Sequence, residues 1–186
     1  MRSIRWKNNK VHGCQVYLRP MQVSDTDKIV SWRNQDRVRR NFIYQKLFTA
    51  ETHLNWIHTQ VEPGHVVQFM ICEAPADRAV GSVYLRDIDR EKGIAEYGIF
   101  IGEEDALGKG YGTQAAKFTL AYAYEELKLK TVFLRVFADN MRARRSYEKA
   151  GFCQIMGKQE NVVIDGVEKE VVFYAVAPGK LQIGKR

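Results

Sequence analysis

A strand, a glycine-rich turn, a helix and a second strand follow one another between residues 94 and 137, and this order constrains the fold more than any other feature. Residues 94–102 and 131–137 are rich in β-branched and aromatic side chains, which is typical of strands. Between them, apolar residues recur at helical spacing over residues 112–127: Ala116, Leu120, Ala123 and Leu127. A helix that connects two strands in this way forms a crossover unit, and the rest of the domain has to be built around it.

The remaining segments add antiparallel strands and further helices. Residues 66–73 and 79–87 precede the crossover unit as strands of a meander, and Asp165-Gly166 predicts a hairpin of residues 162–164 and 167–176. The other expected elements are a strand at residues 15–19, a helix capped by Ser24, a helix capped by Thr49 that ends before Pro63, and a helix opened by Asp139 and Asn140 and closed by Gly151. The sequence thus predicts an α+β domain whose mixed, mainly antiparallel sheet of about seven strands is flanked by about four helices.

The length of 186 residues, 45% of them hydrophobic, suits one domain with a sizeable core. We expect that domain at residues 14–176, with a loosely ordered N-terminus at 1–13 and a flexible tail at 177–186. The sequence has no run of about 18 apolar residues and no secretion signal, so we expect a cytoplasmic protein without a membrane partner. Cys14, Cys72 and Cys153 are far apart, which favours reduced thiols over disulfides, a catalytic cysteine or a zinc site.

The formal net charge of +7 is spread unevenly, because basic residues prevail near both ends and acidic residues in the middle. The basic residues form no long run and accompany no zinc-finger or RNA-binding signature, so we expect no nucleic-acid partner. This uneven charge is also compatible with the binding of phosphorylated small molecules. His53 and His58 are five residues apart, a spacing that does not direct two ligands to one ion, and we expect no metal.

The turn between the third meander strand and the long helix carries three alternating glycines. Its residues are Leu107, Gly108, Lys109, Gly110, Tyr111, Gly112 and Thr113. Glycines let backbone N–H groups turn toward one point without β-carbon clashes, and the start of the helix adds the positive end of its dipole. The turn therefore suits an anion, although a flexible connector would use the same residues.

A second cluster lies on the helix that follows the crossover unit. It consists of Asn140, Ala143, Ser146, Tyr147, Gly151 and Phe152. Asn140 and Tyr147 are seven residues apart, which is two helical turns, so they share one face. Taken alone, Tyr147 fits a packing aromatic better than a proton donor, but the two clusters together favour a functional role.

With these two clusters the sequence resembles the GCN5-related N-acetyltransferase (GNAT) superfamily, and within it the branch similar to ribosomal-protein-alanine acetyltransferases. The resemblance covers residues 16–176 and is most specific between Glu96 and Phe152. The acetyl-CoA turn of the superfamily usually reads Gln or Arg, two residues, Gly, one residue, then Gly or Ala. Here Leu107 occupies the first place and Gly110 and Gly112 the others, which removes a side chain but keeps the backbone donors.

The resemblance implies a transfer of acetyl from acetyl-CoA to a primary amine that attacks directly. The strand before the turn should splay from its parallel neighbour and hold the pantetheine arm, as an added strand would, through the backbone of Ile99, Phe100 and Ile101. The turn residues 107–113, Asn140 and Arg145 complete the implied cofactor site, with Lys109 and Arg144 as further candidates for the phosphates. Tyr147 takes the place of the proton donor, and we nominate Glu96 as the base, with an ion pair as its alternative role.

The acceptor stays open at this stage. In the same branch, the region of Trp32, Arg33 and Asn34 forms one wall of the acceptor site, and Arg33 and Asn34 are our candidate substrate residues. This basic wall, which continues with Arg37, Arg39 and Arg40, favours a nucleotide-linked amino sugar, whereas the acidic middle segment would attract a polyamine or a protein N-terminus. The resemblance also allows a homodimer. The alternative function is a non-catalytic acyl-CoA-binding regulatory module.

Overall fold

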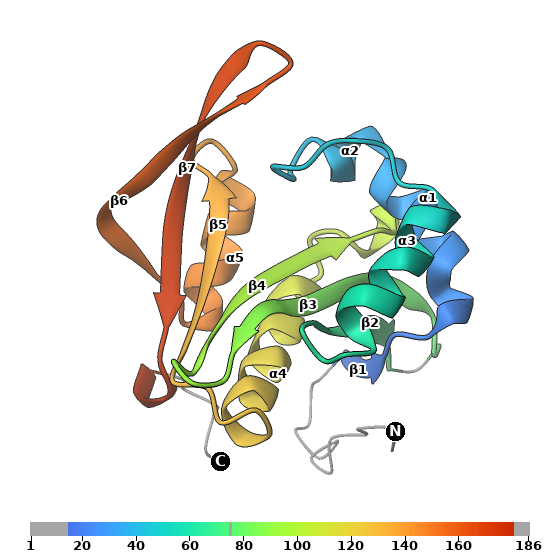
Figure 1. Ribbon diagram of the computed structural model, residues 1–186, viewed down its shortest axis with the longest axis horizontal. Coiled ribbons are helices and arrows are strands. Elements are labelled where there is room, and N and C mark those ends of the chain that lie inside the picture. The colour runs from blue at the N-terminus through green and yellow to red at the C-terminus, as the bar shows by residue number, and fades with distance from the viewer. Residues whose placement is uncertain (1–14, 75, 181–186) are drawn as a thin grey trace.

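The computed structural model describes residues 15–74 and 76–180 and shows one seven-stranded sheet (Figure 1). In the order in which they pair, the strands are β1 (Val16–Pro20), β2 (Val67–Glu73), β3 (Ala79–Asp89), β4 (Ile94–Ile101), β5 (Thr131–Phe137), β7 (Val167–Val176) and β6 (Cys153–Ile164). Strands β4 and β5 are parallel, and the other neighbouring pairs are antiparallel. The predicted mixed, mainly antiparallel sheet is therefore confirmed.

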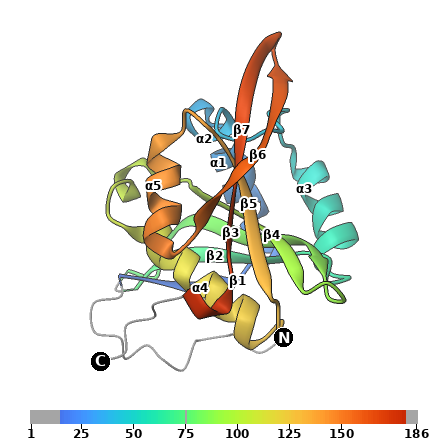
Figure 2. The same cartoon turned by 90° about the vertical axis from the view of Figure 1, so that its left-hand side faces the viewer.

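Helices cover both faces of the sheet (Figure 2). Helices α4 (Tyr111–Glu125) and α5 (Met141–Ala150) lie on one face, and α1 (Thr26–Asn34), α2 (Asp36–Arg39) and α3 (Ala50–Trp56) lie on the other. The helix that the sequence did not predict is α2, because four residues are too few to show a helical period. Within the described part of the chain, no helix is both long and apolar enough to cross a bilayer.

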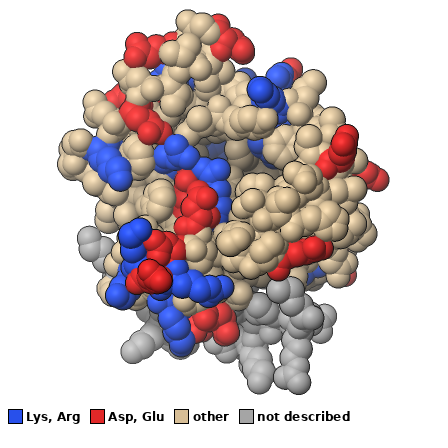
Figure 3. Space-filling view, in the orientation of Figure 1, with Lys and Arg blue, Asp and Glu red and all other residues tan. Residues whose placement is uncertain are grey.

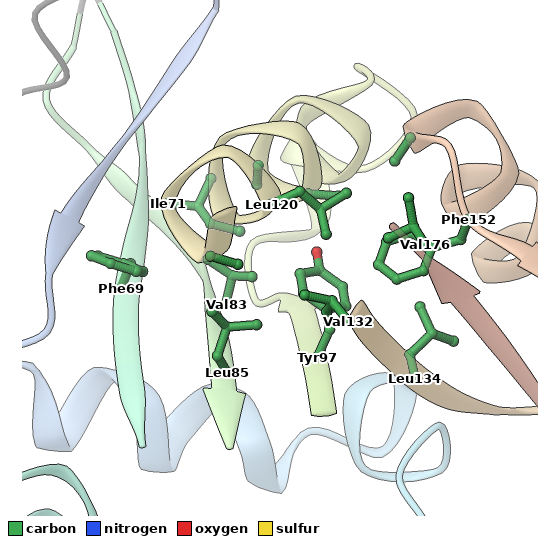
Figure 4. Close-up of a cluster of buried hydrophobic side chains, with 14 of the residues drawn as sticks. Phe69, Ile71, Val83, Leu85, Tyr97, Leu120, Val132, Leu134, Phe152 and Val176 are labelled. Atoms are coloured by element: carbon green, nitrogen blue, oxygen red, sulfur yellow. The ribbon is translucent and has the colours of Figure 1, made fainter. Parts of the chain in front are cut away.

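Side chains alternate along the strands and so form a core layer on each face. The larger layer packs β-strand residues such as Ile71, Val83 and Tyr97 against Leu120 of α4 (Figure 4). The smaller layer packs Met70, Cys72 and Phe100 against Ile29 and Trp32 of α1. The smaller layer ends at β4, whereas the larger one continues over β5 and β7, and β4 has packed side chains on either face.

Local signals set several of the predicted element ends. The Thr49 hydroxyl accepts a hydrogen bond from the Thr52 N–H at 3.1 Å, and Asn140 Oδ1 accepts one from the Ala143 N–H at 3.1 Å. Gly151 ends α5 with a φ of 105°. The predicted caps of α3 and α5 are therefore confirmed, since each of these residues satisfies backbone groups that the helix leaves unpaired.

Two predicted boundaries are wrong. Ser24 does not cap α1, because it lies within a short 3₁₀ turn (Val23–Asp25) in which the Asp25 carboxylate accepts the Gln22 N–H at 2.8 Å, and α1 begins only at Thr26. Strand β6 begins at Cys153 rather than at residue 162. Its pairing register shifts between Gln154 and Gln159, which breaks the alternation that would have revealed the strand.

The predicted domain limits extend beyond what the structure describes. The expected N-terminal segment 1–13, Cys14 and residues 181–186 of the expected tail lie outside the described residues. Pro178–Lys180 form a 3₁₀ turn after β7. Cys72 and Cys153 are free thiols, the first buried and the second exposed.

Candidate active site

Strands β4 and β5 are joined at one end only. Their register pairs Ile94 with Thr131, Ala95 with Val132, and Glu96 with Phe133, and the described strands share no further pair. Beyond these residues the two strands diverge (Figure 1). The edge of β4 from residue 97 onward therefore presents backbone groups that β5 does not bind, as the resemblance implies for the place of the pantetheine arm.

The three nominated residues of β4 face different sides. Ile99 and Ile101 are half-buried and pack on the α4 face. Phe100 points to the opposite face, where its ring meets Trp32 at a centroid distance of 6.2 Å and Phe42 at 6.0 Å. Because neighbouring side chains point to opposite faces, it is the backbone of this segment that borders the split along its length. This matches a role in binding an extended chain through main-chain hydrogen bonds.

The glycine turn places free N–H groups at the start of α4. Gly108 and Gly110 have φ angles of 81° and 80°, a conformation that favours glycine. The first backbone hydrogen bond of α4 runs from the Gln114 N–H to the Gly110 carbonyl, so the N–H groups of Tyr111, Gly112 and Thr113 have no partner within the helix. Together with the helix dipole they form a site suited to phosphate.

The side chains of the turn point away from that site or tie it to its surroundings. Tyr111 is buried, and its hydroxyl donates to Glu73 Oε1 at 3.1 Å. Lys109 lies 3.8 Å from the same Glu73 oxygen. The Thr113 and Ser146 hydroxyls are 3.0 Å apart and link α4 to α5. Tyr111, Lys109 and Thr113 thus have protein partners for their side chains, whereas the backbone N–H groups at the start of α4 have none within the helix.

Tyr147 on α5 lies beside the split in an aromatic cluster. Its ring centroid is 6.1 Å from that of Tyr97 and 6.0 Å from that of Phe152, in edge-on arrangements. Burial raises the pKa of Tyr147, and the neighbouring Tyr84 raises it further. The phenol is therefore kept in its neutral, proton-carrying form.

Tyr84 belongs to this site although the sequence gave no reason to choose it. Its ring lies against the backbone of Gly98, where any β-carbon would come within 2.2 Å of the ring, so Gly98 is required for this contact. Burial raises the pKa of Tyr84 too. Tyr84 is on β3 and Tyr147 on α5, so only the folded topology brings them together.

Glu96 is buried between two arginines. Its carboxylate accepts from Arg86 Nη2 at 2.8 Å and from Arg135 Nε at 3.1 Å. Arg135 in turn reaches Glu160 on β6 at 3.1 Å. The ion pair weighed as the alternative for Glu96 is thus present, and Arg86 and Arg135 are site residues that the sequence did not single out, because they come from β3 and β5.

The other nominated polar residues have structural partners. Arg144 binds the Tyr174 hydroxyl, the Ala138 carbonyl and Gln154, which fixes it against the C-terminal strands. Arg145 is exposed on α5. Asn140 caps α5 and donates through Nδ2 to Asn41 Oδ1 at 3.0 Å, a bridge from the loop after α2 to the start of α5.

The predicted acceptor wall lies on the α1 side of the sheet. Arg33 is 7% exposed and stacks on Phe42, with its Cζ atom 3.3 Å from the ring centroid. Asn34 binds the backbone of Phe48 at both ends of its amide, at 2.8 and 2.9 Å, and so holds the loop after α2 in place. Arg37 donates to the carbonyls of Ile101 and Gly102 at the end of β4.

No group of three or more histidine, cysteine, aspartate or glutamate side chains is arranged to hold a metal ion in residues 15–74 and 76–180. His53 Nδ1 lies 3.1 Å from the Thr26 hydroxyl, and His58 lies 3.0 Å from Glu62 on the same helical segment. Both histidines thus have protein partners.

Comparison with known proteins gives one family and a set of similar structures. The family model of the acetyltransferase (GNAT) domain matches residues 15–153. A probable N-acetyltransferase of Bacillus subtilis (strain 168), YjcK, is 29% identical over 172 residues, which cover 88% of this chain and 94% of that protein. The putative ribosomal N-acetyltransferase YdaF of the same organism is 29% identical over 96 residues, or 52% of each chain.

Among solved structures, the spermidine N-acetyltransferase of Vibrio cholerae in complex with CoA and spermine superimposes with a TM-score of 0.82. It is 22% identical, and the match covers 89% of this chain and 97% of that one. At this identity the likeness concerns the fold. It agrees with the seven-stranded sheet of this chain.

Proposed function

Because the chain belongs to the GNAT family of acetyltransferases, enzymes that use acetyl-CoA as co-substrate, we propose that it transfers acetyl to a primary amine by direct attack in a ternary complex. The observation that carries this proposal is the split between β4 and β5, which has the glycine turn at one side and Tyr147 at the other. Acetyl-CoA supplies a thioester whose carbonyl carbon forms a bond to the amine nitrogen as the bond to sulfur breaks.

The residues of this chain fit that co-substrate. The free N–H groups of Tyr111, Gly112 and Thr113 would bind its phosphates, and the unpaired edge of β4 would bind its extended arm. Arg145 is exposed and free to reach a phosphate, whereas Lys109 would first have to leave Glu73. Asn140 can turn its amide toward the arm only by giving up Asn41 or its capping bond.

Tyr147 is the proposed proton donor to the departing thiolate. A thiolate of this kind has a pKa near that of a cysteine, about 8.5, so it leaves more readily when it receives a proton. The raised pKa of Tyr147 keeps its proton in place at neutral pH, where the donor has to carry one. Its position beside Tyr97 and Phe152 restricts the ring to one orientation.

Glu96 is the proposed acceptor of the proton from the amine. Both of its oxygens are bound to arginines, so we propose that it acts through a water rather than by direct contact. The two guanidinium groups fix its direction and occupy both of its oxygens. This is the reason to test the assignment of Glu96 separately from that of Tyr147.

The acceptor is an amine, and the three classes left open by the sequence are a nucleotide-linked amino sugar, a polyamine and a protein N-terminus. The similar proteins do not favour one class of acceptor, since one is named a putative ribosomal N-acetyltransferase and another was solved with spermine. A cytosolic location and a homodimer are part of the same proposal. One neighbour, the spermidine N-acetyltransferase of Vibrio cholerae, is described as dodecameric.

The test is the release of CoA thiol from acetyl-CoA in the presence of each acceptor class in turn. We expect rapid release with one class and only slow hydrolysis without an acceptor. If calorimetry shows tight acetyl-CoA binding while no amine in a broad panel is acetylated, the non-catalytic acyl-CoA-binding module replaces the enzyme. If acetyl-CoA does not bind, the whole proposal is wrong.

A further inference from the structure

Arg33 is a buried cation for which the described part of the chain provides no counterion. Its side chain lies at the end of α1 and is 93% buried, since its exposed fraction is 7%. Its Nη1 atom is buried and has no hydrogen-bond partner among the described residues. The described residues also give it no ion pair, in contrast to Arg19, Arg78, Arg86 and Arg135, each of which has a carboxylate within 3.5 Å.

The surroundings of Arg33 are aromatic. Its guanidinium lies over Phe42 at 3.3 Å and faces Phe48 at 4.7 Å and Phe100 at 6.0 Å, measured to the ring centroids. These rings offset part of the cost of burying the charge through cation–π attraction. They leave the buried Nη1 donor without an acceptor among the described residues, and a buried donor without an acceptor is costly.

Arg33 stays charged under ordinary conditions. Burial lowers the pKa of Arg33 to about 10, and the neighbouring Tyr84 opposes part of this change. At neutral pH the side chain is therefore a guanidinium whose N–H groups have no anionic partner within residues 15–74 and 76–180. Among side chains, this one is the best suited to bind carboxylate or phosphate, because its planar fork matches two oxygens at once.

Several carboxylates on this face of the sheet are paired with arginines other than Arg33. Arg86 binds Asp87 and Glu96, and Arg135 binds Glu96 and Glu160. Figure 3 shows a hollow near the middle of this face, with basic atoms at its edge and an acidic group beside it. An entering anion would find in Arg33 a cation that no described carboxylate neutralises, whereas a polycation would have to compete with Arg86 and Arg135 for their carboxylates.

We propose that Arg33 binds an oxyanion of the acceptor, so that the preferred acceptor is an amine that also carries a carboxylate or a phosphate. This inference rests on the proposed acetyl transfer and narrows its acceptor. Arg33 faces Phe100, whose side chain lies on the same face of β4 as that of Glu96, so the oxyanion site lies on the Glu96 side of the sheet. The amine and the acidic group of one small molecule would thus lie within reach of Glu96 and Arg33 together.

The first test compares acceptors that differ only in the acidic group. One pair is 1,3-diaminopropane and 4-aminobutanoate, in which a carboxylate replaces an ammonium, and the other is ethanolamine and its phosphate ester. We expect the acid-bearing member of at least one pair to have a kcat/KM about ten- to a hundredfold higher, the range of a charge-assisted hydrogen bond. The carboxylate pair and the phosphate pair show which oxyanion is preferred.

The variant Arg33→Gln should abolish this preference while Arg90→Gln retains it. Arg90 is exposed in the turn between β3 and β4, so its replacement removes the same charge far from the site. The inference is overturned if the unmodified protein prefers the diamine in one pair and ethanolamine in the other, so that neither acid-bearing amine is the better acceptor. It is also overturned by a preference for acid-bearing amines that survives in Arg33→Gln.

A second measurement keeps the inference testable when none of these four amines is acetylated. The protein is saturated with CoA, which fills the phosphate site of the glycine turn and permits no reaction, and is titrated calorimetrically with 4-aminobutanoate and with ethanolamine phosphate. Binding that Arg33→Gln loses and Arg90→Gln keeps supports the oxyanion site even if acetyl transfer fails. Absence of binding of both compounds, or equal binding to the two variants, overturns it.

Discussion

At the scale of single residues, the proposed role of Tyr147 in proton transfer depends on its hydroxyl and not on its ring. The ring packs on Tyr97 and Phe152 and would pack equally well without the oxygen. We therefore expect Tyr147→Phe to keep the fold and the KM for acetyl-CoA while kcat falls about 10²- to 10⁴-fold, the range for loss of a general acid. Steady-state kinetics measure both constants.

The matched control is Tyr122→Phe. Tyr122 is a half-buried tyrosine of α4 whose ring packs on Phe69 at 5.1 Å, on the same face of the sheet but outside the aromatic cluster of Tyr147. Its variant should keep full activity. Equal kcat in Tyr147→Phe and the unmodified protein would remove Tyr147 from the mechanism.

The raised pKa of Tyr147 also makes a prediction about pH. A donor whose pKa lies above the usual value of about 10 loses its proton only at still higher pH. The profile of kcat/KM should therefore rise with pH as the amine loses its proton and show no descending limb below about pH 10. A descending limb centred between pH 7 and 9, in a buffer range where the protein stays folded, would contradict this assignment.

Glu96 can be tested apart from its arginines. We expect Glu96→Gln to lower kcat/KM about tenfold or more and to flatten the rise with pH, because the amide cannot accept the proton. It also leaves Arg86 and Arg135 without their shared partner, so the control is Glu160→Gln, which removes the other partner of Arg135. A flattened profile in Glu96→Gln alone supports the base, and an unchanged slope assigns Glu96 to the ion pair only.

At the scale of elements, the shape of the glycine turn depends on positive φ angles, which glycine adopts without the strain that other residues would have. A β-carbon at Gly110 would touch nothing within 4 Å, so Gly110→Ala acts through its φ of 80° alone. We expect a loss of stability of about 1 to 2 kcal/mol and a clearly raised KM for acetyl-CoA, because relaxation of the turn redirects the N–H groups. Thermal unfolding and kinetics provide the two readings.

Gly157→Ala separates strain from function. Gly157 lies in β6 with a φ of 74° and equally open space around a β-carbon, so it should lose similar stability without any change in KM. If the two variants raise KM alike, the effect of Gly110→Ala is a general consequence of lower stability. If neither changes KM, the turn does not bind the co-substrate.

Elements with local signals were predictable from the sequence, and this explains which parts of the site could be found in advance. The glycine turn, the Asn140 cap and the Asp165-Gly166 hairpin are each specified within a few residues, and the structure shows a matching element at each. Arg86, Arg135 and Tyr84 have no such signal, because they become neighbours of Glu96 and Tyr147 only when β3, β4, β5 and α5 assemble. The prediction that Ser24 caps a helix was wrong because the carboxylate of the neighbouring Asp25 accepts the backbone hydrogen bond in this turn.

At the scale of the whole molecule, the protein is two groups of strands that meet along a short seam. Strands β1 to β4 form one group and β5 to β7 the other, and the seam consists of the three pairs that begin at Ile94 and Thr131. Away from the seam, the described polar bridges between the groups include Thr113 to Ser146 and Asn41 to Asn140. A ligand that adds a strand in the split would join the two groups along their length.

That arrangement predicts where acetyl-CoA should protect the backbone. Strand β4 pairs with β3 in the antiparallel sense, and such pairing binds only alternate N–H groups of β4. The other N–H groups along residues 97–101 point toward the split and exchange with solvent. We expect acetyl-CoA to slow hydrogen exchange in residues 97–101 and to change it little in Ile94–Glu96, which β5 already pairs. The same ligand should raise the free energy of unfolding by about 2.7 kcal/mol at a hundred times its Kd. Protection confined to the glycine turn would support the proposed phosphate site and show that the pantetheine arm does not lie between β4 and β5.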